Sequence, residues 1–184
     1  ITITPSVTIT PSITVTPSVT VTPSTTPPSC GASWTETAHL TASNAASSTW
    51  IPSDIALRDE YALLGAEAAD TPAGGAAYIF RGPGATAWTE TAILTSSNTE
   101  LHDDFGMSVG FNKNHDAFIG ARKGGLAGGD KGIVFVFEHD GLNNWTEAAY
   151  LTASDAADHD VGFGHSVRVE PISGDMVLVG NPNA

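Results

Sequence analysis

The chain is poor in basic residues, in cysteine and in long apolar runs, and each scarcity excludes a class of protein. Only 7 of its 184 residues are Lys or Arg, against 20 Asp or Glu, so its net charge is −13. Nucleic-acid binding depends on neutralising phosphates with Lys and Arg, so this balance argues against it. No apolar run approaches the roughly 20 residues that cross a bilayer as a helix, which predicts no membrane span.

The single cysteine, Cys30, excludes a disulfide framework within one chain. It is interpreted either as a free thiol in a linker or as a cross-link to another chain. The sequence opens at Ile1 without the basic and apolar segments of a signal peptide, and we expect that such a peptide has already been removed. The predicted location is therefore extracellular or at the cell surface.

Residues 1–24 are a six-residue repeat of the form Ile/Val-Thr-Ile/Val-Thr-Pro-Ser, and residues 1–30 carry no charge. This composition predicts an extended Thr/Ser/Pro-rich arm over 1–30 and a folded domain over 31–184. Alternating β-branched residues and Thr favour a strand, but the regular prolines prevent a continuous one. The even period keeps the apolar side chains on one side of an extended chain. The predicted strand-donating residues are Ile1, Ile3, Val7, Ile9, Ile13, Val15, Val19 and Val21.

Several interpretations of the arm compete. Thr and Ser beside Pro are typical of O-glycosylated stalks, which would make the arm a stiffened spacer. Alternatively, the stretches between the prolines are short strands that complete another sheet. Ice binding needs a flat threonine surface, which one proline-broken strand does not provide. The candidate O-glycosylation sites are Thr2, Thr4, Ser6, Thr8, Thr10, Ser12, Thr14, Thr16, Ser18, Thr20, Thr22 and Ser24.

The rest of the chain contains an internal repeat. Trp-Thr-Glu recurs at Trp34, Trp88 and Trp145 and opens the similar stretches WTETAHLTAS, WTETAILTSS and WTEAAYLTAS. Self-similarity at a period of about 55 residues is typical of propellers and repeat arrays. A Phe-Gly pair opens at Phe105 and at Phe163, while Trp50-Ile51 holds the same place in the first repeat.

A Gly-Ala pair follows at Gly65 and Gly120, and the third copy has Gly180-Asn181-Pro182. A Gly-rich link and a Tyr/Phe-containing apolar run come next at 76–80 and 132–137. Each repeat thus offers short β-runs separated by turn residues, and none has a sustained helical period.

Over about 34–184 these motifs resemble the FG-GAP repeat family, which forms the blades of the integrin α-chain β-propeller and of many bacterial surface proteins. The resemblance implies extracellular blades used for adhesion, often with calcium in loops between strands. It also implies a strand order with the Phe-Gly strand innermost, Gly-Ala next, Tyr/Phe third and Trp outermost. The repeat-core residues are then Trp34, Trp88, Trp145, Phe105 and Phe163.

The predicted fold is all-β, with about three tandem four-stranded antiparallel propeller-like blades, one of them incomplete, and an extended N-terminal arm. The expected strands lie near 50–57, 61–66, 76–82 and 88–96, near 105–112, 117–122, 132–139 and 145–153, and near 163–170 and 176–181. Residues 34–42 are the candidate outer strand of the third blade, which then lacks its third strand. Closed propellers have about four to eight blades, so either the chain is a piece of a longer one or neighbouring chains supply the missing parts.

The missing strand and the spare arm suggest that the arm of one subunit enters the incomplete blade of the next. Such a contact is heterologous and builds rings or filaments. We therefore expect a non-enzymatic extracellular structural subunit that forms a homopolymeric fibre. The alternative is a calcium-assisted adhesion module of a larger cell-surface protein, with glycans or a cell-surface ligand as its partner.

Calcium is the one candidate cofactor, because clustered carboxylates and amides are its usual ligands. The turns before two Phe-Gly strands are acidic, and the loop after the first of them retains part of an Asp-x-Asp-x-Asp pattern with a lysine inside it. The candidate ligands are Asp103, Asp104, Asp155, Asp158, Asp160, Asn112, Asn114 and Asp116. Solvated acidic turns are the competing interpretation.

No catalytic pattern accompanies these features. The six histidines have no zinc-binding spacing, there is no Gly-x-Ser-x-Gly, and the Gly-rich stretch 123–132 lacks the Gly-Lys-Ser/Thr of a phosphate-binding loop. The chain is therefore predicted not to be an enzyme. Asn144-Trp145-Thr146 is an N-glycosylation sequon, which makes Asn144 a candidate site.

Overall fold

A computed structural model describes part of one compact unit, Glu36–Ala184. The described residues are 36, 38–44, 52–67, 74–82, 87–97, 103–126, 129–154, 162–170, 172–173 and 176–182. The expectations for the arm over 1–30, for its strand-donating and O-glycosylation residues, for Cys30 and for Trp34 lie outside these residues. All regular structure in the described ranges is β-strand, which confirms the all-β fold class.

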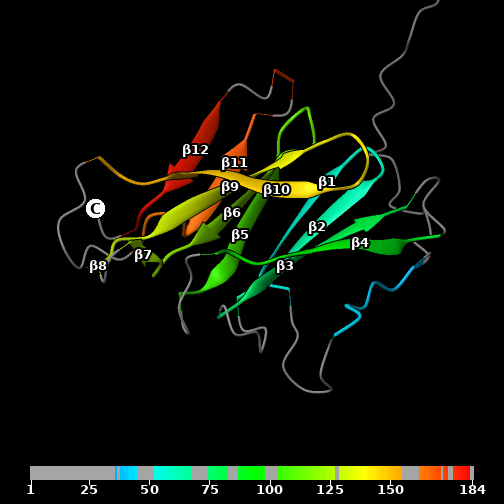
Figure 1. The fold of residues 1–184 in the computed structure, drawn as a ribbon, viewed down its shortest axis with the longest axis horizontal. Helices are drawn as coiled ribbons and strands as arrows, with labels where there is room; N and C mark the ends of the chain where they lie inside the picture. Colours follow the sequence, from blue (N-terminus) through cyan, green and yellow to red (C-terminus); the bar gives the residue numbers. More distant parts are fainter. Residues whose placement is uncertain are drawn as a thin grey trace, which may run out of the picture. The chain divides into compact units, whose positions relative to one another are not determined.

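Four antiparallel strands form the first blade (Figure 1). They are β1 (Asp54–Arg58), β2 (Tyr61–Ala66), β3 (Ala76–Arg81) and β4 (Thr89–Leu94), paired in chain order. A tight turn joins β1 to β2, and Asp59 in it has a φ of 50°, a left-handed conformation in which Asp is enriched. The four runs expected between 50 and 96 correspond to these strands.

The second blade has the spatial order β10-β9-β6-β5. Its strands are β5 (Phe105–Phe111), β6 (Ala117–Ala121), β9 (Ile133–His139) and β10 (Trp145–Leu151). A small hairpin of β7 (Gly125–Leu126) and β8 (Gly129–Asp130) lies in the connection from β6 to β9. The Phe-Gly strand is at one edge of the sheet and the Trp strand at the other, in the order that the resemblance implied.

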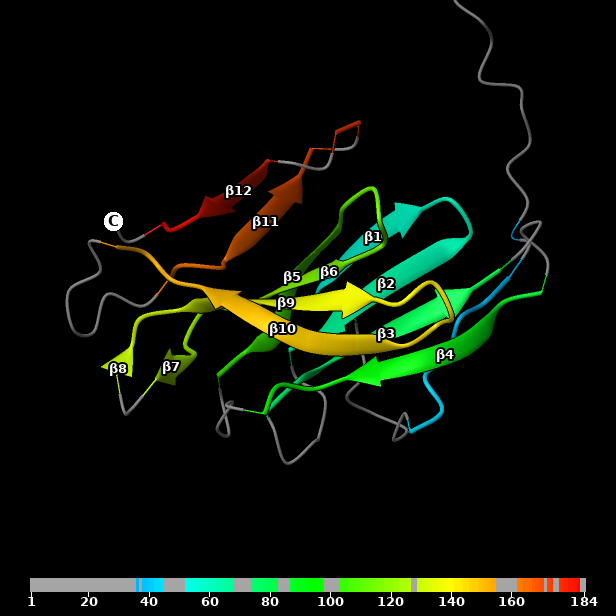
Figure 2. The same ribbon diagram turned by 45° about the horizontal axis from the view of Figure 1, so that its top comes forward.

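In the described residues, the third blade has two strands, β11 (Ser166–Val169) and β12 (Val177–Gly180). Figure 2 shows this hairpin beside the second blade, where Val167 and Val179 pack in a cluster with Phe118. The structure therefore confirms tandem blades of which one is incomplete.

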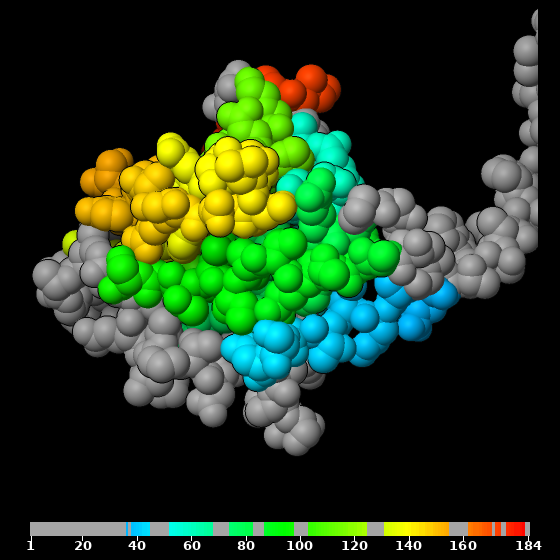
Figure 3. Space-filling model, turned by 45° about the vertical axis from the view of Figure 1, so that its right-hand side comes forward, coloured from blue at the N-terminus to red at the C-terminus, as the bar shows by residue number. Residues whose placement is uncertain are grey.

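The expectation that 34–42 is the outer strand of the third blade of its own chain is wrong for the residues described. Residues 38–44 form no strand and lie beside β4 of the first blade, as the blue and green surfaces in Figure 3 show. Leu40 and Ala42 pack against the outward face of that blade. Burial of these side chains favours this position, because the described part of the third blade offers no third strand with which 38–44 could pair.

The largest apolar cluster lies between the first and second blades. Leu63, Phe105 and Phe135 are fully buried in it, and each such side chain contributes about 1.5–3 kcal/mol to folding. A separate cluster around Tyr78 and Phe80 covers the other face of the first blade, so β2 and β3 are buried on both faces. The described ranges contain no helix long and apolar enough to cross a bilayer.

Candidate functional site

Glycines join each blade to the next. Gly106 and Gly164 have φ angles of +91° and +86°, which favour glycine, and both directly follow the Phe of the Phe-Gly pair. Their carbonyl oxygens lie so close to Gly65 and Gly120 that a Cβ at either position would overlap them. The Phe-Gly segment of one blade therefore packs directly against the Gly-Ala strand of the preceding blade, which explains why both motifs recur.

A serine–glutamate clasp links successive Trp strands at the rim. The Ser97 backbone N–H and hydroxyl donate to the Glu147 carboxylate at 3.0 and 3.2 Å, and Ser43 makes the same pair of bonds to Glu90 at 2.8 and 2.6 Å. This clasp was not predicted from the sequence. Its signal was present, because Glu recurs two residues and Ser nine residues after each Trp of Trp-Thr-Glu.

The acidic turn before β5 is tied to basic residues. Asp104 accepts from Arg122 Nε at 2.7 Å and lies 3.0 Å from Lys123 Nζ, so two cations face its carboxylate. The neighbouring Asp103 is 7% exposed, and its backbone carbonyl accepts from the Lys123 N–H at 3.3 Å. These contacts fasten the turn before β5 to the turn after β6.

The loop after β5 is closed by its own side chains. Asn112 Oδ1 accepts from the N–H groups of Asn114 and Asp116 at 2.9 and 3.0 Å, and Asn112 Nδ2 donates to Asp116 Oδ2 at 2.8 Å. Asp116 Oδ1 accepts from the His139 N–H at 2.9 Å. These oxygens hold backbone in place, which is the structural role of an Asx turn.

The structure does not bring the described calcium candidates together. Asp103 and Asp104 precede β5, whereas Asn112, Asn114 and Asp116 follow it, so the two groups lie at opposite ends of one strand. Among the described residues, no group of three or more His, Cys, Asp or Glu side chains is arranged to hold a metal ion. Asp155, Asp158 and Asp160 lie outside the described residues.

An aromatic and histidine cluster fills the loop end of the first two blades. The ring of His139 stacks on Trp145 at 4.3 Å, and the ring of Tyr61 lies 4.9 Å from that of His115. His115 Nε2 lies 2.9 Å from the Asp59 carboxylate. Burial raises the pKa of the Tyr61 phenol. Beside this cluster is a recess of about 510 Å³, which could not be predicted from the sequence because its lining residues come from separate repeats.

The candidate glycosylation residue Asn144 is exposed at the start of β10. Its side-chain amide donates to Asp140 Oδ2 at 2.7 Å, and this bond, with the Leu142 N–H, lowers the pKa of Asp140. The adjacent Trp145 is half-buried, and its indole N–H donates to the His115 carbonyl at 2.8 Å. The amide that a glycan would need is thus engaged in a turn.

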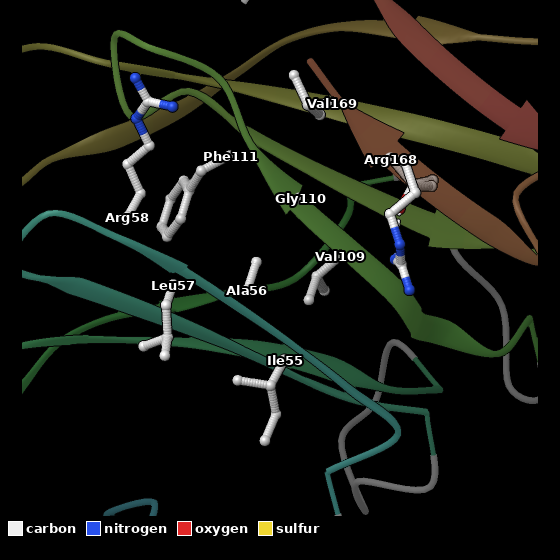
Figure 4. A pocket seen from close by; sticks show the side chains of 10 residues that line it. Ile55, Ala56, Leu57, Arg58, Val109, Gly110, Phe111, Arg168 and Val169 are labelled. Atoms are coloured by element: carbon white, nitrogen blue, oxygen red, sulfur yellow. Dashed lines mark hydrogen bonds between the residues drawn. The ribbon is translucent and has the colours of Figure 1, made fainter. Parts of the chain in front are cut away.

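The innermost strands β1, β5 and β11 line a groove of about 300 Å³ (Figure 4). Its apolar lining includes Val109 and Phe111 of β5, and Arg168 lies at one side. Arg168 Nη1 lies 3.3 Å from Asp54 Oδ2, and that carboxylate also accepts from the Val109 N–H at 3.0 Å. The groove lies where a closed propeller has its central channel, and the described residues leave one side of it open.

The remaining core candidates follow the blade pattern. Phe105 is fully buried between the first and second blades, and Phe163 is half-buried between the second and third. Trp88 and Trp145 are half-buried at the rim. The family model of the FG-GAP repeat matches residues 34–80, 88–137 and 145–184.

The chain belongs to the FG-GAP repeat family. No curated protein sequence matches it. The third matched segment contains the hairpin of β11 and β12. By comparison with the second blade, in which β6 pairs with β9, the third strand of a complete blade would pair with the outer edge of β12.

Proposed function

We propose that this FG-GAP protein is a non-enzymatic structural subunit that assembles into an extracellular fibre, with the arm of one chain added as a strand to β12 of the next. The observation that carries the proposal is the open edge of β12. In the second blade β6 pairs on both sides, with β5 and with β9, whereas its counterpart β12 pairs only with β11 among the described strands.

The backbone groups at this edge are available to an added strand. The Glu170 N–H donates to the Met176 carbonyl at 2.9 Å. Hydrogen-bonded pairs alternate with non-hydrogen-bonded pairs along an antiparallel ladder, so Val177 and Val179 direct their N–H and C=O groups away from β11. An exposed edge of this kind is a template for strand addition.

The length and chemistry of the arm suit this edge. β12 has four residues, and each arm unit offers four Ile/Val-Thr residues between prolines. An added unit would place its β-branched side chains beside Val177 and Val179, next to the apolar cluster of the second and third blades. The uncharged arm meets no repulsion from the strongly acidic domain.

Two changes test the proposal. Deleting residues 1–24 removes the donor, and Val179→Pro removes an outward N–H of the acceptor while leaving the bonds between β11 and β12. Val179→Ala is the control, because it shortens the same side chain but keeps the N–H. Negative-stain electron microscopy should show filaments for wild type and Val179→Ala and none for the other two variants.

Filaments from the chain that lacks residues 1–24 would refute strand donation. Dispersed single chains of the intact protein would support the adhesion module instead, with the loop recess as its first candidate ligand site.

A further inference from the structure

The two blade joints inside the chain repeat one set of contacts. The Gly106 carbonyl sits at Gly65 in the first joint, and the Gly164 carbonyl sits at Gly120 in the second. In the second joint the Ser108 hydroxyl also donates to the Gly164 carbonyl at 2.8 Å. Each joint therefore has a socket side, built from a glycine and its cross-strand neighbour, and a carbonyl side.

The free face of the third blade has the socket side of a further joint. Ser166 pairs with Gly180 as Ser108 pairs with Gly120. A Cβ added at Gly120 would meet the carbonyl of the next blade, whereas one added at Gly180 would meet only Ser166 among its nearest atoms. No described residue fills this socket.

Both end faces expose large apolar side chains. Leu178, on the same face as Gly180, is 72% exposed. On the outward face of the first blade, Ile55 and Leu57 are 55% and 72% exposed and lie opposite Leu64 and Ala62 of β2. Adjacent exposed apolar side chains of this kind mark interaction surfaces.

The rim clasp is also open at both ends. Ser154 is the third equivalent of Ser43 and Ser97, and Glu36 is the first equivalent of Glu90. Neither Ser154 nor Glu36 has a hydrogen-bond partner among the described residues. In both clasps, the serine follows one Trp-Thr-Glu motif and the glutamate belongs to the next such motif along the chain.

We propose that the free face of the third blade docks on the outward face of the first blade of a second copy, so that the internal joint is repeated between chains. This register places residues 36–44 of the second copy as the outer strand of the third blade and sets its Glu36 beside Ser154. The same placement brings Glu36 to Ser154 and covers Leu178 and Leu57, and the residue that would present its carbonyl to the socket, Ile51, lies outside the described residues.

The contact is heterologous, so it closes into a ring or continues as a filament. Two copies contribute six blades, which is within the range of closed propellers. The docking stands without the arm.

Single charges on the two faces test the contact in the full-length chain. Leu57→Glu and Leu178→Glu should each weaken self-association by about tenfold or more in sedimentation velocity, because a carboxylate would be buried in the joint. Leu142→Glu is the matched control, since Leu142 is a 77% exposed leucine on the turn before β10. Equal association constants for all three variants would overturn the proposal.

A cross-link locates the register. With Cys30→Ser, the pair Glu36→Cys and Ser154→Cys should give linked dimers and higher species with a short bis-maleimide, as seen on a denaturing gel. The internal pair Ser97→Cys and Glu147→Cys should give single-chain products. Single-chain products from both pairs would overturn the register.

The two proposals fail separately. Loss of filaments on deleting residues 1–24, with no effect of Leu57→Glu or Leu178→Glu, would leave strand donation and remove the face contact. The reverse pattern would leave the face contact and remove strand donation.

Discussion

Replacing Gly65 by alanine tests whether the blades are joined through glycine. The φ of Gly65 is not in the left-handed region, so alanine brings no backbone strain there. Its Cβ would overlap the Gly106 carbonyl oxygen, lie 3.0 Å from the carbonyl carbon and lie 2.9 Å from Val109 Cγ1. Because backbone cannot rotate away as a side chain can, the second blade must shift. We expect the free energy of unfolding to fall by about 3 kcal/mol, which is in the upper part of the range for overpacked cores.

Equilibrium urea unfolding, followed by tryptophan fluorescence at a concentration where the chain is dispersed, measures this change. Gly120→Ala should behave in the same way, because its Cβ would overlap the Gly164 carbonyl oxygen. Gly141→Ala is the control: no atom lies within 4 Å of its Cβ, and its φ of +80° alone costs about 1 kcal/mol. A Gly65→Ala variant no less stable than Gly141→Ala would refute the close approach of the blades.

Three further changes probe the clasp and the loops. Glu147→Ala should destabilise the rim, with a coupling to Ser97 of about 0.5 kcal/mol in a double-mutant cycle, because the bonds are exposed; no coupling would contradict the clasp. The pKa of Tyr61 is raised above its unfolded value of 10.0, so its contribution to stability is present below pH 10.0 and is lost as pH rises through the folded pKa. The melting temperature of Tyr61→Phe should therefore vary less with pH in the alkaline range. The pKa of Asp140 is lowered below 3.8, so its contribution to stability is present above pH 3.8 and is lost as pH falls through the folded pKa. Asn144→Ala should therefore reduce the loss of stability in acid, and a melting temperature with unchanged pH dependence in acid would contradict this.

The strands could be predicted because the same motifs and turn residues separate them in each repeat. Phe105 and Gly120 mark β5 and β6, and turn residues separate the runs, so the period and the turns agree. The position of 38–44 could not be predicted, since the sequence shows that Leu40 and Ala42 are apolar but not which blade face they cover.

The candidate sites were harder to predict than the strands. The turn at Asp104 is acidic locally, and only the structure shows that Arg122 and Lys123 from the far side of β6 neutralise it. Likewise, the Ser and Glu of the clasp recur in the sequence of each repeat. An alignment of the repeats matches equivalent positions, and it does not show that Ser97 contacts the glutamate of the next repeat. The repeat pattern of the sequence therefore predicts the strands within each repeat but not the contacts between repeats.

The two-stranded third blade has a consequence for the motion of the chain. Stability in a repeat array is a sum of each repeat and its nearest-neighbour joints. The second blade is packed on both sides, whereas the third has one joint and half the usual strands, so amide hydrogen exchange should be slowest in β6 and β9 and fastest in β11 and β12. In the proposed assembly, the subunit would fluctuate most at the end that receives the next chain, and each addition would slow the opening of the blade that received it.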